Sequence, residues 1–331
     1  MTKRLHWVDI GKGILIILLL VHHFVAEAPK VNINKNLFWF VFSWQVLYTS
    51  FFMQAFFFLS GYCSSFDIPF ATFIKKLIKQ LVIPFICFEI LICLWDSYPW
   101  NSSVVVSIWN YWLQSNGTSL WFINALIFSK LVIWIINRIH KSDILLLAFS
   151  FILLFVAIYL KQNNIGDNFL CFRQSLAAVL FVSLGFILKE KEKLFEKLLR
   201  LGVLFPYILL LLPLFKIPIP QVTSRMDVGL LSIPVFVFVS TCGTFELIRV
   251  CKYIGNSKIL EFFGKNTLII YSLNHIVLIS SLFLLNRLWN PLSFVESVLF
   301  IIVFYSFVLM IFTILILLFR QKPLCWTLGR F

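Results

Sequence analysis

The chain has 331 residues, of which 61% are hydrophobic, 18% aromatic and only 13% charged. Soluble domains are about a quarter charged and disordered chains have low hydrophobicity, so this composition excludes both classes. The seven Cys are scattered without C-x-x-C spacing, which excludes a disulfide-stapled secreted scaffold. The composition therefore predicts an all-α polytopic membrane protein.

Ten apolar runs are long enough to cross a bilayer once Pro, Asn, Gly and charge clusters are used as breaks. They cover about 10–28, 37–63, 77–96, 119–137, 143–160, 169–188, 201–216, 228–250, 266–286 and 295–319. The seventh run is short and flanked by prolines, and the segment around Trp100 to Trp112 has the aromatic content of a membrane interface. We expect one integral-membrane domain over 1–331, with no separate soluble domain.

The distribution of the basic residues between the loops tests the count of ten spans. With the N-terminus in the cytoplasm, 20 of the 28 Lys and Arg fall in inside loops or ends, 7 fall outside, and Lys130 lies within the fourth span. Positive charge favours the cytoplasmic side, so the alternation predicts about ten spans with both termini cytoplasmic. The net charge of +14 then reflects topology, and no nucleic-acid partner is expected.

The first span could be mistaken for a signal peptide, because an apolar run follows Lys3 and Arg4 and ends in a cleavage-like Ala-Glu-Ala triplet. Charged and imidazole side chains within and before the run argue instead for a retained helix. At 100° per residue, Asp9, Lys12, His23 and Glu27 share one face of that helix, and His22 points to nearly the opposite side. Glu27, four residues beyond His23, is expected within reach of its ring.

Two histidines of the predicted spans are candidates for chemistry. A His within a span often only satisfies hydrogen bonds between helices, but His23 could also act as a general base near neutral pH. His275 is the second candidate, in the ninth span. Asn266, at the start of that span, could be either a site residue or a helix cap.

Several motifs in chain order resemble the membrane-bound acyltransferase-3 family, integral-membrane O-acyltransferases that modify bacterial surface sugars. The first resembles that family's first helix, with an apolar run ending in His23. The motifs are Asp9-Ile10-Gly11-Lys12-Gly13-Ile14, Phe56-Phe57-Phe58-Leu59-Ser60-Gly61-Tyr62, the basic Lys75, Lys76 and Lys79 before Pro84, Leu120-Trp121-Phe122, and Gly264-Lys265-Asn266-Thr267 through His275. The last is similar to the fucose 4-O-acetylase-like and exopolysaccharide acyltransferase branch.

The resemblance implies transfer of an acyl group, most often acetyl, from cytoplasmic acyl-CoA to a sugar hydroxyl. It implies a catalytic role for His23, for which Asp9 and His275 are further candidates. It also implies that basic residues bind the phosphates of the donor, here Lys76 and Lys79, with Lys75 as a third candidate. Lys12, on the polar face of the first span, is a further donor-binding candidate. Positive-inside bias alone also explains lysines in that loop. We favour direct general-base transfer over an acyl-histidine intermediate, because no second nucleophile stands beside His23 in sequence.

The chain departs from the family's pattern in two ways. Phe52 and Gln54 stand where the family often has His and Pro, and Lys replaces Arg in the basic motif, which loses bidentate phosphate geometry. Pocket or acceptor candidates are Glu27, Ser60, Tyr62, Trp121, Arg173 and Asn266. Trp121 is equally explained by packing and Arg173 by membrane anchoring, while Lys130 could pair with Glu89 or with backbone.

Acyl-CoA, a glycan or lipid-linked sugar and membrane lipids are the expected partners, with no bound cofactor or metal, in the bacterial inner membrane. The oligomeric state is open. The alternative function is a transporter or flippase for a sugar or lipid-linked glycan, whose pathway the same polar stripe would line. Paired broken helices and an internal repeat would favour transport.

Overall fold

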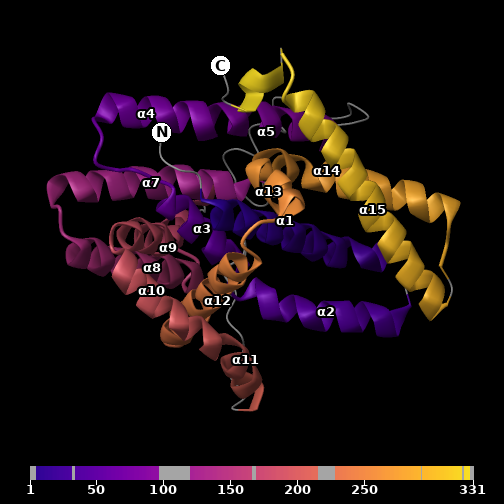
Figure 1. Cartoon of the computed structure of the whole chain (residues 1–331), viewed down its shortest axis with the longest axis horizontal. Coiled ribbons are helices and arrows are strands. Elements are labelled where there is room, and N and C mark those ends of the chain that lie inside the picture. The colour runs from indigo at the N-terminus through magenta and orange to yellow at the C-terminus, as the bar shows by residue number, and fades with distance from the viewer. Residues whose placement is uncertain are drawn as a thin grey trace.

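The computed structural model describes residues 5–31, 34–96, 120–165, 169–214, 228–291, 293–322 and 324–328, and every regular element in these ranges is helical (Figure 1). The prediction of an all-α protein is therefore confirmed. The Trp100–Trp112 segment lies outside the described residues. The α-helices are α1 (His6–Glu27), α2 (Lys35–Thr49), α3 (Phe52–Tyr62), α4 (Phe70–Leu77), α5 (Ile83–Asp96), α7 (Trp121–Ile139), α8 (Asp143–Gln162), α9 (Phe172–Glu190), α10 (Glu192–Leu199), α11 (Leu204–Leu214), α12 (Ile233–Ile254), α13 (Lys258–Lys265), α14 (Thr267–Leu288) and α15 (Phe294–Phe319).

Eight helical segments of the described chain are long and apolar enough to cross a membrane. They are His6–Lys30, Phe70–Trp95, Trp121–Ile139, Asp143–Gln162, Phe172–Glu190, Leu230–Ile254, Thr267–Leu288 and Phe294–Phe319. The expected seventh span is represented by the eleven residues of α11, and the expected second span is divided between α2 and α3. The protein is a multi-pass membrane protein, and the count of ten stays a prediction.

The division of the second span has a local cause. The chain leaves the helical path at Ser50 and Phe51, so the Ser50 carbonyl is free to accept a hydrogen bond from the Ser240 hydroxyl of α12, 2.7 Å away. The Phe51 ring lies against Gly243, where an added Cβ would approach it to 2.6 Å. A break at membrane depth is tolerated because protein groups satisfy the exposed backbone.

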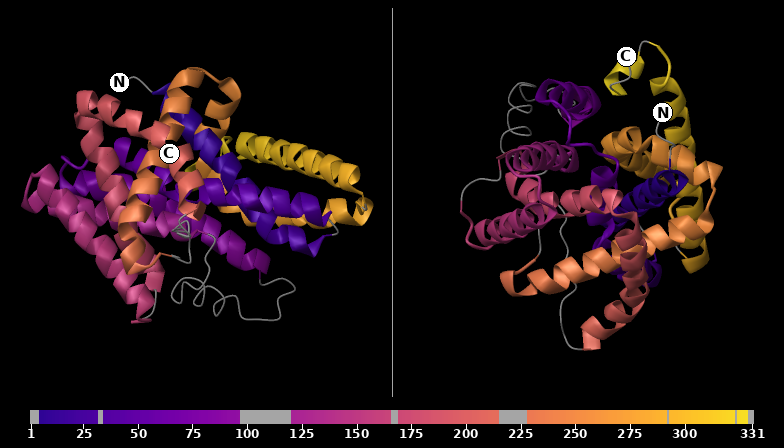
Figure 2. Two further views of the ribbon diagram at one scale, coloured as in Figure 1. Left: turned by 90° about the horizontal axis from the view of Figure 1, so that it is seen from below. Right: turned by 60° about the vertical axis from the view of Figure 1, so that its left-hand side comes forward.

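The basic loops gather at one end of the molecule. Contacts between loops that the charge pattern assigns to the inside are Lys141 with Asp67 at 3.1 Å, Lys189 with the Ser64 carbonyl at 3.2 Å, and Arg320 with Asn266 at 3.3 Å. At the other end, the Asn34 amide donates to the Ser297 hydroxyl. The hairpins α1–α2 and α14–α15 lie side by side with their turns at this same end (Figures 1 and 2). This arrangement agrees with the predicted alternation; the side of the membrane that each end faces stays a prediction.

Glycines bring α1 and α13 into backbone contact. An added Cβ would lie 2.1 Å from the Leu260 carbonyl oxygen at Gly13, and 1.7 Å from the Asp9 carbonyl oxygen at Gly264. Small residues are enriched at helix interfaces in membranes because they permit this close approach. α13 is therefore fixed against the first turns of α1.

A second glycine pair joins α3 to α9. A Cβ at Gly61 would lie 2.0 Å from the Val182 carbonyl oxygen, and one at Gly185 would lie 2.0 Å from the Phe58 carbonyl oxygen. Together the two contacts hold α1 and α3 in the centre of the bundle, where the polar side chains lie.

Candidate active site

Lys12 and Ile16 of α1 line a cavity of about 200 Å³ in the centre of the bundle. Its other walls come from α3, α7, α14 and the turn before α5, and include Met53, Ser60, Gln80, Phe122 and Tyr271. The Tyr271 hydroxyl accepts a hydrogen bond from the Phe122 amide at 3.1 Å, which fixes its position on the cavity wall.

The structure places His23 and His275 near each other, on the two helices that contribute Ile16 and Tyr271 to this cavity. His23 lies two turns beyond Ile16 on the same face of α1, and His275 lies about one turn beyond Tyr271 on α14. Both imidazoles are half-buried, and they lie within electrostatic reach of each other. The two histidines singled out from the sequence thus form a pair across two helices.

His22 is less remote from this pair than its position on the helix suggested. Its Nδ1 is hydrogen-bonded to the Gln45 side chain of α2, so it does turn away from the face of Lys12. Its ring centroid nevertheless lies 5.5 Å from that of His23. Successive residues differ by only 100° around a helix, which keeps adjacent rings in contact.

Three lysines converge at the lysine-rich end of the cavity. Lys76 and Lys130 line a second cavity of about 170 Å³, which adjoins the first because both include Gln80 and Leu81. Lys12 Nζ lies 4.0 Å from the Sγ of Cys63 in the second cavity, and Lys130 is within electrostatic reach of Lys12. Within the described ranges, no carboxylate lies within ion-pair distance of Lys12, Lys76 or Lys130. Like charges gathered without a counter-ion favour an anionic ligand.

The lysines of the basic motif divide between two cavities. Lys75 and Lys79 line a separate cavity with Ala71, Ile74, Ile78 and Ile83, whereas Lys76 and Gln80 turn to the cavities described above. Residues four apart share a helix face and adjacent residues do not, so the motif divides between two surfaces. Lys130 lines the same cavity as Lys76, although the sequence suggested for it only a pairing with Glu89 or with backbone. A lysine inside an apolar span is costly, and this is the signal that could have marked it as a site residue.

Asp9 belongs to a charged network that joins α1 to α13. Its carboxylate lies 3.9 Å from Lys265, whose ammonium also binds Glu261 at 2.7 Å, and Glu261 is hydrogen-bonded to His6 at 2.8 Å. Hydrogen bonds from Lys265 and His6 lower the pKa of the Glu261 carboxyl to about 2. Asp9 lies fourteen residues before His23, roughly 21 Å along the helix, so the structure places it in this network and away from the histidine pair.

Among the acceptor candidates, Ser60 lines the cavity with Lys12, and Tyr62 packs edge-on against Trp7 with ring centroids 5.0 Å apart. Glu27, expected beside His23, forms an ion pair with Lys30. Trp121 packs against Phe57 at 6.4 Å, as the packing alternative predicts.

The two remaining candidates stabilise helix ends. Arg173 donates to the Ile165 carbonyl at 2.9 Å, at the end of the molecule away from the lysines. Asn266 occupies the cap position of α14, but its side chain makes no cap hydrogen bond. Its amide donates to the Phe262 carbonyl at 2.6 Å and its oxygen accepts from Arg320.

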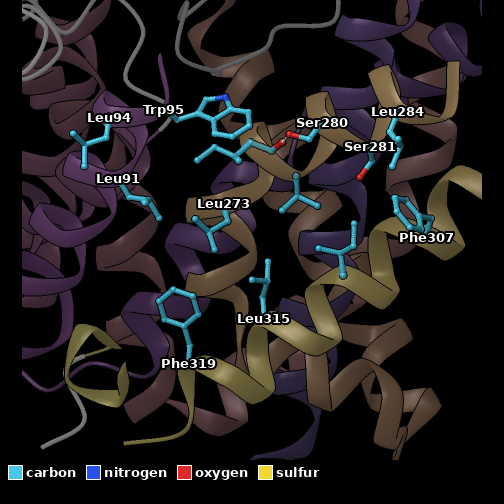
Figure 3. A pocket seen from close by; sticks show the side chains of 13 residues that line it. Leu91, Leu94, Trp95, Leu273, Ser280, Ser281, Leu284, Phe307, Leu315 and Phe319 are labelled. Carbon is cyan, nitrogen blue, oxygen red and sulfur yellow. Dashed lines mark hydrogen bonds between the residues drawn. The ribbon is translucent and has the colours of Figure 1, made fainter. Parts of the chain in front are cut away.

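A larger cavity lies elsewhere. It has a volume of about 910 Å³ and lies between α5, α14 and α15, with Leu side chains from all three helices and Phe side chains from α15 around it (Figure 3). Its α14 residues, including Leu273 and Leu284, lie on the face opposite His275. Because its lining is apolar and faces away from the histidines, the smaller polar cavities are the candidate site.

A match to a known protein family covers the helices and the cavities described above. The family described as an acyltransferase domain, acyltransferase-3, matches residues 5–320. The chain belongs to this family. The protein is therefore a membrane acyltransferase, and the resemblance drawn from its motifs is confirmed at the level of the family. No curated protein and no solved structure matches the chain.

The architecture of this acyltransferase gives the family motifs physical roles. Gly13, Gly61 and Gly264 lie in three of the motifs, and each makes a close helix contact. Lys12 and His23 lie on the α1 face that these contacts orient towards α14. In the described part of the chain, no group of three or more metal-ligand side chains occurs.

Proposed function

We propose that this acyltransferase transfers an acyl group, most often acetyl, from cytoplasmic acyl-CoA to a hydroxyl of a cell-surface glycan or its lipid-linked precursor. One observation carries the proposal. His23 and His275 lie near each other, and His23 shares a face of α1 with Lys12, which lies beside Lys76 and Lys130 in two adjoining cavities; none of the three lysines has an ion-pair partner among the described residues. A base and an anion site are thus joined along one helix.

The lysine end is suited to the donor. Lys12, Lys76 and Lys130 supply point charges for phosphate groups. Lys12 and Lys76 are among the basic residues that the charge pattern assigns to the cytoplasmic side. Acyl-CoA carries phosphates at one end and a thioester at the other. Held by its phosphates at the lysines, the donor would extend its acyl end along α1 towards His23.

The histidine end is suited to the transfer. An imidazole nitrogen of His23 removes the proton of the acceptor hydroxyl as its oxygen attacks the thioester carbonyl. The new C–O bond forms, the C–S bond breaks, and the thiolate leaves and takes up a proton. His275, within reach of His23, is placed to orient it or to exchange that proton. The acceptor would approach in the bacterial inner membrane or from its outer face.

The structure gives the transport alternative little support. Transporters place ligand and ion sites at the ends of broken helices. The break between α2 and α3 has its free Ser50 carbonyl bonded to Ser240, so this group is already occupied by protein.

The proposal is tested with purified full-length protein, radiolabelled acetyl-CoA and a panel of methyl glycosides as acceptors. General-base catalysis contributes about 100-fold or more, so His23→Ala should lower transfer at least that far. His140→Ala is the matched control, because this imidazole is exposed outside the cavities. Transfer undiminished in His23→Ala would overturn the assignment of the base, and sugar movement across vesicles without acyl-CoA would favour transport.

A further inference from the structure

Three polar side chains form a buried group beside the histidines. Gln45 and Tyr48 lie three residues apart on α2 and therefore share a face, and Tyr305 comes from α15. The Tyr48 and Tyr305 phenol groups lie within electrostatic reach of each other. We call these three residues the α2–α15 polar group.

One polar atom of each of these side chains lacks a hydrogen-bond partner among the described residues. The hydroxyls of Tyr48 and Tyr305 and the Oε1 of Gln45 are inaccessible to solvent, and none has a hydrogen-bond partner among the described residues. Tyr48 as a whole is only 9% exposed. Leaving a buried polar group unsatisfied costs about 1–3 kcal/mol, so three in one place require an explanation.

A chain of contacts connects the group to the proposed base. The Gln45 amide is hydrogen-bonded to His22, and the His22 ring lies beside the His23 ring. The amide oxygen and nitrogen of Gln45 can be exchanged, but either assignment leaves one of them unpaired. Phe52 adds an apolar ring to the same region, 5.6 Å from His22 and 5.9 Å from Tyr48.

We propose that the α2–α15 polar group binds hydroxyl groups of the acceptor sugar that neighbour the reacting one. This inference rests on the proposed function, and it names acceptor-binding residues for the same site. A phenol hydroxyl both donates and accepts, as a sugar hydroxyl does, and the amide of Gln45 supplies the other neutral partner. The group carries no formal charge, which fits a neutral polyol better than a phosphate.

The location separates the two substrates. The lysines lie at the opposite end of α1 from His22 and His23, eleven residues from Lys12 to His23, or about 16 Å along the helix. Donor phosphates and acceptor hydroxyls would thus bind at different ends, with His23 between them.

Removing single oxygen atoms tests the proposal. Tyr48→Phe and Tyr305→Phe keep the ring and delete only the unpaired hydroxyl. Each variant should raise the KM for a methyl glycoside that the wild-type protein acetylates on the order of 3- to 10-fold, the effect of losing one neutral hydrogen bond. The KM for acetyl-CoA should stay unchanged, and the unfolding temperature should be equal or higher, because no protein hydrogen bond is lost.

Tyr159→Phe, which alters an exposed tyrosine of α8, is the control and should leave both KM values unchanged. If the wild-type protein acetylates a glycoside and the two Phe variants keep its acceptor KM, the polar group has no part in acceptor binding. A fall in unfolding temperature with both KM values intact would assign the hydroxyls a structural role. Absence of glycoside transfer by the wild-type protein would instead overturn the proposed function.

Discussion

Single lysines decide how the proposed donor end of the site is built. Spacing along the first helix was sufficient to place Lys12 and His23 on one face, because one regular helix connects them. The basic motif was harder to interpret, since its membership was visible in the sequence but its division between two cavities depends on how α4 packs. Lys130 is a second example. The energetic cost of a lysine inside an apolar span is evident from the sequence, but the residues that surround it in the folded protein are not.

Lysine substitutions should separate the two cavities. Lys76→Ala and Lys130→Ala should each raise the KM for acetyl-CoA about tenfold or more, the effect of losing one charge-assisted hydrogen bond. Lys75→Ala, from the same motif but another cavity, should change it less than about twofold. Steady-state kinetics with varied acetyl-CoA measure this, and equal effects at Lys75 and Lys76 would contradict the division.

The carboxyl of Glu261 gives the protein a pH-dependent contact. Because its pKa is lowered from 4.5 to about 2 in the folded protein, the charged form stabilises the fold at neutral pH. That contribution is lost as the pH falls from about 4.5 through about 2. Glu261→Gln should therefore lower the unfolding temperature at pH 7 and have progressively less effect below pH 4.5. A difference that is constant across this range would show that the charge is not responsible.

The position of most membrane-spanning helices follows from the length of the apolar runs, and the packing of some of them depends on glycines. Eight of the ten expected spans appear as long apolar helices, since length and composition suffice to define them. The span expected over 37–63 is divided between α2 and α3, and the sequence could not show this because the break depends on Ser240 and Gly243, nearly 200 residues away. Part of the resemblance to the acyltransferase-3 family rests on Gly13, Gly61 and Gly264. Only the structure shows that each of them packs closely against another helix.

The contact of α1 with α13 should be sensitive to a single methyl group. Gly264→Ala would place a Cβ 1.7 Å from the Asp9 carbonyl oxygen, so α13 must move, at a cost of about 1–3 kcal/mol for overpacking. Thermal unfolding in detergent measures this loss. Gly11→Ala is the control on α1, because its nearest neighbour is the end of the Leu59 side chain at 3.3 Å. Equal unfolding temperatures for the two variants would contradict the close contact.

Across the whole molecule, the charge pattern and the contacts agree on which loops lie together. The alternation of basic loops could be predicted from the sequence because it reflects how each loop is oriented on insertion. The position of α2 against α15, and with it the polar group beside His22, could not, since it depends on long-range packing.

Cysteine labelling tests whether α2 and α3 together cross the membrane. Cys63 is exposed at the lysine-rich end, and Lys35 is exposed at the start of α2. In chains with one cysteine, Cys63 should react with a membrane-impermeant maleimide only after cells are permeabilised. A cysteine introduced by Lys35→Cys should react in intact cells. Labelling of both from the same side would show that this segment does not cross.

The spacing between Lys12 and His23 on α1 sets a distance that a substrate must match. A continuous helix sets the backbone separation between Lys12, in the proposed anion site, and His23, the proposed base, at about 16 Å, and no loop interrupts it. A donor must therefore carry its reactive carbonyl on an arm of matching length from its phosphates. A compact acyl phosphate, with both groups on adjacent atoms, could occupy one end or the other but not both. The first helix would thus select its donor by reach.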